Sequence, residues 1–143
     1  MPGRADPVPP CPCGSARAYA ACCGRWHDGP LQFQAPDAAS LMRSRYAAYV
    51  LRRAPYLLAT WHPSTRPTQL DLDDPDLRWL GLEVRRHRTS TGAAANASVR
   101  ELAEVEFVAR SKRHGRAHRL HETSRFVREG GRWYYLDGTL LEP

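Results

Sequence analysis

The residues of this chain best suited to chemistry are its four cysteines, which all lie between positions 11 and 23. One residue separates Cys11 from Cys13, and Cys22 is adjacent to Cys23, so the sulfurs within each pair are too close in sequence for a relaxed disulfide. Thiolates can instead converge on one ion, and zinc prefers four sulfur ligands in a tetrahedron. The spacing therefore predicts a zinc site, and a metal-free redox cluster is the alternative.

The cysteine spacing resembles the SEC-C motif, which has a Cys-x-Cys-Gly-Ser turn, an aromatic residue in the following segment, and then two metal ligands followed by glycine. Gly14, Ser15, Tyr19 and Gly24 occupy the corresponding positions here. The resemblance implies that all four cysteines are zinc ligands. It also implies contacts with proteins or the ribosome, because the motif is similar to the C-terminal tail of the SecA translocase.

Four further runs resemble the YchJ-like family, which joins this motif to a domain similar to nuclear transport factor 2 (NTF2). They are residues 41–50, 60–63, 121–126 and 132–138. The resemblance implies an α+β fold, in which N-terminal helices pack on a curved antiparallel sheet to form a cone around a cavity. We expect residues 1–30 to form the SEC-C zinc knuckle with an extended lead, and residues 31–143 to form the NTF2-like domain.

Length and composition limit the remaining possibilities. A chain of 143 residues can bury one core and carry a small metal module beside it. Clustered cysteines favour a reducing compartment, and the sequence has neither a secretory leader nor an apolar run long enough to span a bilayer. We therefore expect a cytoplasmic protein without a membrane partner. The net charge of +6, carried almost entirely by arginine, predicts attraction to polyanions.

Hydrophobic periodicity predicts helices first and strands afterwards. Asp37 can cap a helix whose apolar residues recur at helical spacing to about Arg53, and Pro55 can begin a second short helix that ends before Pro63. Alternating patterns then predict three strands, over residues 80–85, 104–110 and 119–128, and a hairpin returns the chain through a fourth, over residues 133–136. This order independently favours an α+β fold.

The turns between the expected strands differ in the strength of their signals. Gly130-Gly131 is typical of a two-residue hairpin between the last two strands. The stretch 89–98 is small and polar, so we expect a flexible loop there. Trp26, beside the cysteines, should pack the knuckle onto the main domain, because a small metal module needs a neighbour to cover it.

The expected cavity suggests an enzyme or a small-ligand binder as an alternative function. Its expected lining is Tyr46, Tyr49, Trp61, Glu122 and Trp133. Glu122 among aromatic residues could act as a general base, because apolar surroundings raise the pKa of a carboxyl group. His62, at the end of the second helix, is the other catalytic candidate. Standard catalytic motifs are missing from the sequence, so an enzyme is the less favoured interpretation.

Glu122 also has a structural interpretation, which we favour. Buried carboxylates usually need a partner, and Arg43 and Arg45 lie on the facing helix. An ion pair between Glu122 and one of these arginines would join the helix to the sheet. A helix-capping role is the corresponding structural interpretation of His62.

Two dense basic runs suggest a binding function. Their side chains are Arg85, Arg86, Arg88, Arg110, Lys112, Arg113 and Arg116. Together with the net positive charge and the knuckle, they predict a nucleic-acid or ribosome-associated binding module. An ordinary solvated surface is the structural alternative for each run. A protein adaptor that binds its partner through the knuckle is the third functional hypothesis.

Overall fold

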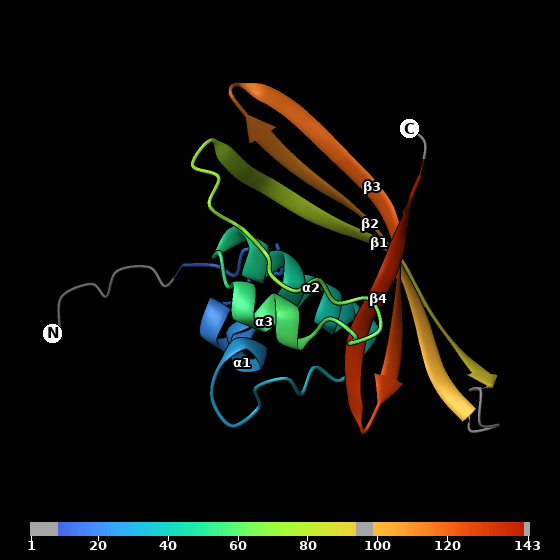
Figure 1. The fold of residues 1–143 in the computed structure, drawn as a ribbon. Helices are drawn as coiled ribbons and strands as arrows, with labels where there is room; N and C mark the ends of the chain where they lie inside the picture. The colour runs from blue at the N-terminus through green and yellow to red at the C-terminus, as the bar shows by residue number, and fades with distance from the viewer. Residues whose placement is uncertain (1–8, 94–98, 142–143) are drawn as a thin grey trace, which may run out of the picture.

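The computed structural model describes residues 9–93 and 99–141. Its helical part comes first and consists of the 3-10 turn η1 (Tyr19–Ala21) and the helices α1 (Gly24–His27), α2 (Ala38–Val50) and α3 (Ala54–Ala59). Four strands follow, namely β1 (Leu77–Ala93), β2 (Val99–Arg113), β3 (Arg116–Glu129) and β4 (Arg132–Leu140). They form one antiparallel sheet in the order β1-β2-β3-β4, which confirms the α+β prediction. The helices lie together against one side of the strongly twisted sheet (Figure 1).

Helix α2 is the element that joins the layers, because it contacts α1, α3 and strands β1, β2 and β4. Its predicted cap is confirmed: the Asp37 carboxylate accepts a hydrogen bond of 2.7 Å from the backbone N–H of Ser40. The helix ends at Val50 rather than near Arg53, because Arg52 takes a left-handed φ of 58° that an α-helix cannot continue. Pro55 lies in the first turn of α3, as predicted.

The sheet is longer than the alternating patterns predicted. Residues 89–93, expected to belong to a flexible loop, continue β1 and pair with residues 99–103 of β2. Backbone pairing does not depend on the small polar side chains from which the loop was predicted, which explains the difference. The rest of that predicted loop, residues 94–98, lies outside the described residues.

Both described hairpins turn through residues with left-handed backbone conformations. Gly130 and Gly131, with φ of 58° and 78°, form the predicted turn between β3 and β4. His114 and Gly115, with φ of 50° and 76°, form the turn between β2 and β3. This second turn brings the basic residues before and after it side by side.

The core lies between α2 and the facing side of the sheet, and its members come from all parts of the chain. Leu41 and Leu57 from the helices pack in one cluster with Phe126 from the sheet. Trp26, 8% exposed, belongs to the same cluster, so the predicted packing of the knuckle against the main domain is confirmed. Within the described residues, no helix is long and apolar enough to cross a membrane.

Candidate metal centre and cavity

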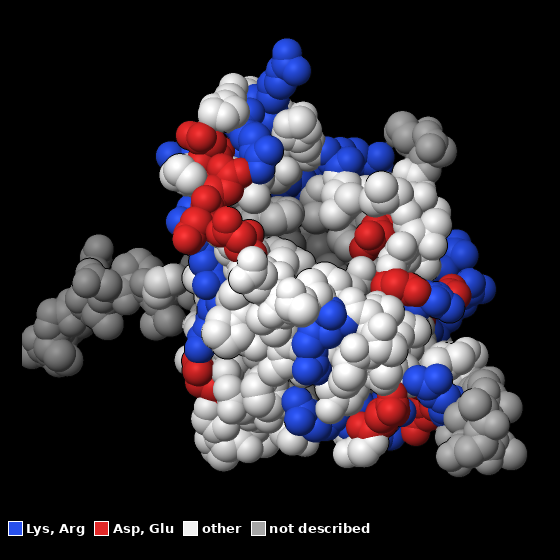
Figure 2. All heavy atoms as spheres, in the orientation of Figure 1, with Lys and Arg blue, Asp and Glu red and all other residues white. Residues whose placement is uncertain are grey.

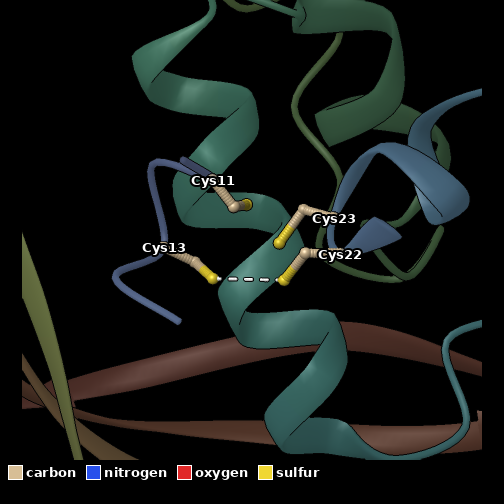
Figure 3. Close-up of side chains that lie close together, drawn as sticks. All are labelled: Cys11, Cys13, Cys22 and Cys23. Atoms are coloured by element: carbon tan, nitrogen blue, oxygen red, sulfur yellow. Dashed lines mark hydrogen bonds between the residues drawn. The ribbon is translucent and has the colours of Figure 1, made fainter. Parts of the chain in front are cut away.

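The four cysteine sulfurs lie together, as the spacing predicted. They are within 4.8 Å of one another, and the Cys13 and Cys22 sulfurs are 3.6 Å apart (Figure 3). A tetrahedral zinc site with Zn–S bonds of about 2.3 Å would place its sulfurs about 3.8 Å apart. All four side chains are buried, although a buried thiolate is costly without a cation. The donor set and its spacing therefore fit a metal ion.

Two short segments bring these sulfurs to one point from opposite sides, beside helix α2 (Figure 3). In the first, the N–H of Cys11 donates to the carbonyl of Arg17 at 2.8 Å, and Gly14 turns the chain with a φ of 85°. In the second, the N–H of Cys22 donates to the carbonyl of Tyr19 at 2.9 Å, which closes η1. The Cys22 sulfur also contacts the Ser15 hydroxyl at 3.1 Å.

The thiols influence one another's ionisation strongly. A hydrogen bond from Cys23 lowers the pKa of Cys13 to about 4, and the same contact raises the pKa of Cys23. Burial raises the pKa of Cys11. The Cys13 thiolate is thus stabilised while the pKa values of Cys11 and Cys23 are raised, because adjacent thiolates repel. A divalent cation would allow all four to ionise together.

The metal-binding segment is fastened to α2 by polar and apolar contacts. Ala47 of α2 is buried in the cluster of cysteines. Arg43 donates from Nη1 to the carbonyl of Cys13 at 3.2 Å. His27 donates from Nε2 to the carbonyl of Ser44 at 2.7 Å, so its Nδ1 can accept from the Tyr19 hydroxyl at 2.5 Å.

His27 is a structural residue that the sequence analysis missed. It is 1% exposed, and burial lowers its pKa, which favours the neutral ring that both hydrogen bonds require. The sequence could have identified it by its position four residues after Cys23, because residues at this spacing lie on the same face of a helix, here beside the expected metal ligands.

A cavity of about 300 Å³ lies between α2 and the sheet, at the place where the cone was expected to be hollow. Its lining is Met42, Arg45, Tyr46, Tyr49, Trp79, Phe107, Ala109, Leu120, Glu122, Ser124 and Tyr135. Of the residues expected there, Tyr46, Tyr49 and Glu122 are present. Trp61 is not part of the lining, and its ring lies against the Arg45 guanidinium and the Tyr135 ring. Trp133 is packed in the core instead.

The predicted ion pair between Glu122 and Arg43 or Arg45 is not formed. Arg43 bonds to the metal-binding segment, and Arg45 donates from Nη1 to the carbonyl of Leu57 at 2.8 Å. The Glu122 carboxylate accepts from the Ser124 hydroxyl at 2.8 Å. The prediction was wrong because Arg45 instead donates to a carbonyl in the last turn of α3, where the helix dipole also favours a cation.

The two catalytic candidates do not share a site. The Nε2 atom of His62 is within hydrogen-bond distance of the Glu129 carboxylate near the end of β3, and its Nδ1 contacts the Ser64 hydroxyl at 2.7 Å. Glu122 lies on the same strand but seven residues before Glu129, which corresponds to about 23 Å at the rise of a β-strand. A proton could not pass directly between these two side chains.

Most of the basic residues are compensated by nearby carboxylates, and they do not all lie on one face of the sheet, because Arg113 alternates with Lys112 and Arg110 along β2. Arg85 and Arg110 share the Glu83 carboxylate, at 3.5 and 3.8 Å, so the two basic runs meet at this point. The other ion pairs of the set are Arg88 with Glu104 and Arg113 with Asp74. The charge of Arg86 helps to lower the pKa of Glu106, behind the larger effect of a hydrogen bond from His121.

At the end of the β2–β3 hairpin, three basic side chains are not compensated by carboxylates of the described residues. Lys112, Arg116 and Arg119 are exposed there, and they make no ion pair with any carboxylate that the structure describes. Figure 2 shows lysine and arginine side chains projecting where Figure 1 places this hairpin, beside a group of acidic side chains.

Known proteins resemble the chain in both of its parts. Residues 10–25 match the SEC-C motif, and residues 37–138 match the family described as "YchJ, middle NTF2-like domain". A UPF0225 protein of Methylibium petroleiphilum is 62% identical over 134 residues, which cover 94% of this chain and 90% of the relative.

Two solved structures of SEC-C motif containing proteins have the same fold. The one from Rhodopseudomonas palustris has a TM-score of 0.75 and 32% identity, and the match covers 94% of this chain and 100% of that one. The one from Psychrobacter arcticus has a TM-score of 0.70 and 30% identity, and the match covers 95% and 85%. The chain therefore belongs to the YchJ-like family of UPF0225 proteins, in which a SEC-C motif precedes an NTF2-like domain.

Proposed function

We propose that this is a zinc-binding protein, and that its zinc is structural. The observation that carries the proposal is the convergence of four buried sulfurs within 4.8 Å of one another. Sulfur-only sites suit zinc, and a site with four protein ligands leaves no position for a substrate. The ion would hold the N-terminal knuckle, proposed as residues 1–30, on the NTF2-like domain of residues 31–143. Four reduced thiols suit a reducing compartment, so we propose a cytoplasmic location.

Metal analysis of protein purified without chelators tests this proposal. We expect one zinc per chain, and a Cys22→Ser variant should lose most of it, because a hydroxyl is a poor zinc ligand. Ser15→Ala is the matched control: it removes the hydroxyl that contacts the Cys22 sulfur but keeps every ligand, so it should still bind one zinc. Folded wild-type protein with four titratable thiols and little zinc would contradict the proposal.

We propose as a second function that the β2–β3 hairpin binds nucleic acid, including the RNA of the ribosome. The observation in its favour is an unfavourable arrangement of charge. Arg116 lies directly opposite Arg113, and Arg119 directly opposite Arg110. Asp74 and Glu83 compensate Arg113 and Arg110, but Arg116 and Arg119 make no ion pair with a described carboxylate, so each pair keeps an excess positive charge that a phosphate backbone would neutralise. Lys112 lies on the same face of the sheet as Arg110 and Arg119, whereas Arg113 and Arg116 lie on the other face.

A salt titration of RNA and DNA binding tests the second function. Replacing Lys112, Arg116 and Arg119 by alanine should flatten the plot of log affinity against log salt by roughly two to three units. The control replaces Arg88, Arg125 and Arg128, which removes the same charge from arginines already paired with carboxylates, and should change the slope less. Equal slopes in both triple variants would refute a specific role of the hairpin. A protein partner bound through the knuckle would be insensitive to the hairpin substitutions.

A further inference from the structure

The cavity under α2 has the size and walls of a small-molecule site. Its volume of about 300 Å³ is at the lower end of the range for ligand pockets. Aromatic and aliphatic side chains form most of its lining, among them Tyr46, Trp79 and Phe107. Leu120, which is 38% exposed, marks a side that is open to solvent. Two charged residues, Arg45 and Glu122, interrupt these apolar walls.

Arg45 brings a buried positive charge to this cavity. The residue is only 3% exposed, and a guanidinium does not lose its proton in a protein. Its Nη1 donates to the Leu57 carbonyl and, at 2.7 Å, to the Thr60 hydroxyl, both of which are neutral. Within the described part of the chain, no carboxylate lies within ion-pair distance of it. A buried charge without a counter-ion is costly, so the site is suited to an anion.

Glu122 brings a negative charge to the same cavity from the opposite layer. Its carboxylate accepts a hydrogen bond from the Ser124 hydroxyl and lies close to Gly138, where a Cβ would come within 2.5 Å of the Glu122 Cδ. Tyr135 lies close to both charged residues. The Arg45 guanidinium is 4.6 Å from its ring centre, and burial, followed by the charge of Glu122, raises the pKa of Tyr135 to about 12.

Two opposite charges therefore line one apolar cavity without forming a pair. A simple anion would be attracted by Arg45 and repelled by Glu122, and a simple cation would meet the reverse. A ligand with both charges would satisfy both residues. We propose that this cavity binds a small organic zwitterion, with its carboxylate toward Arg45, its ammonium group toward Glu122 and an apolar side chain against the aromatic walls.

Calorimetry with the full chain can test this inference with three probes of similar shape. L-phenylalanine carries both charges, 3-phenylpropanoate only the carboxylate and 2-phenylethylamine only the ammonium. We expect L-phenylalanine to bind at least about tenfold more tightly than either analogue, since a hydrogen bond to a charged group contributes about that much. L-leucine serves as a second zwitterion without an aromatic ring.

Three variants that keep the buried Arg45 make the test specific. Glu122→Gln should weaken L-phenylalanine binding by about tenfold and leave 3-phenylpropanoate binding unchanged or tighter. Glu101→Gln, an exposed carboxylate paired with Arg128, is the matched control and should change neither affinity. Ala109→Leu should block all the probes by filling the cavity, and its circular dichroism and melting curve will show whether it is folded.

The outcomes separate clearly. Zwitterion-selective binding that depends on Glu122 and is lost in folded Ala109→Leu supports the inference. Equal affinity for the three phenyl probes, or an unchanged L-phenylalanine affinity in Glu122→Gln, overturns it. So does the failure of both amino acids to bind at about 10 mM, a concentration at which even weak millimolar complexes form.

Discussion

Gly24 offers a test of how tightly the metal-binding turn is packed. It follows the last cysteine of the cluster and begins helix α1. A Cβ built at this position would lie 2.8 Å from the carbonyl oxygen of Tyr19 and 3.0 Å from its ring. Gly24→Ala must therefore push η1 away from α1. Because the Tyr19 hydroxyl also bonds to His27 and to Arg53, the displacement should extend to the contacts with α2 and α3.

The magnitude follows from the clash. Ordinary carbon–oxygen contacts need at least about half an ångström more room, and introducing a methyl group into such a packed site costs about 1–3 kcal/mol. The folded turn is the form that binds metal, so the same free energy should appear as weaker zinc binding. We expect the zinc affinity of Gly24→Ala to fall by about 5- to 150-fold.

Competition with a chromophoric chelator measures this affinity directly. Gly81→Ala is the matched control, because a Cβ there meets nothing within 4 Å and β1 has no need of a glycine at that backbone conformation. It should bind zinc as the wild type does. If Gly24→Ala also kept wild-type zinc affinity and stability, the close packing of Tyr19 on Gly24, and the coupling argued from it, would be refuted.

Three further predictions concern stability. Asp37→Ala should lower the free energy of unfolding by about 1 kcal/mol in urea titrations, because it removes the cap of α2, and an unchanged midpoint would contradict this. Trp26→Ala should cost about 3–5 kcal/mol, as expected for an aromatic residue in the core, and a loss below 1 kcal/mol would place Trp26 outside it. Burial lowers the pKa of folded His27 below its unfolded value near 6.5, so the unfolded chain binds the extra proton first. The contribution of His27 to the free energy of unfolding should thus be fully present above about pH 6.5. Below that pH the free energy of unfolding should fall by up to about 1.4 kcal/mol per pH unit, and zinc-saturated His27→Asn should lack this slope. Identical slopes in both proteins would rule out His27 as the source.

Features governed by neighbours in the sequence could be predicted. The spacing of the cysteines limits them to one small volume, so the convergence of Cys11 and Cys22 required only a turn on each side. The cap at Asp37 and the turn at Gly130 were equally local, because each depends on the backbone preferences of a few adjacent residues. The period-two patterns and the hairpin signal likewise predicted four strands, although not their full lengths.

Features that depend on which elements meet in space could not be predicted in this way. Residues 89–93 became a strand because a partner strand was available, not because of their side chains. Trp79 lines the cavity because its strand passes under α2, which the sequence order of the elements does not show.

The charged residues of the cavity show the division most clearly. The sequence alone predicted that Glu122 would face the first long helix and one of its two arginines, Arg43 or Arg45, because the helical and strand periods limit which side chains point between the layers. Only the tertiary structure decided that they do not pair. Arg45 donates to a carbonyl at the end of α3, and Glu122 accepts from the Ser124 hydroxyl. Which of these partners lies within hydrogen-bond distance depends on how the whole core packs.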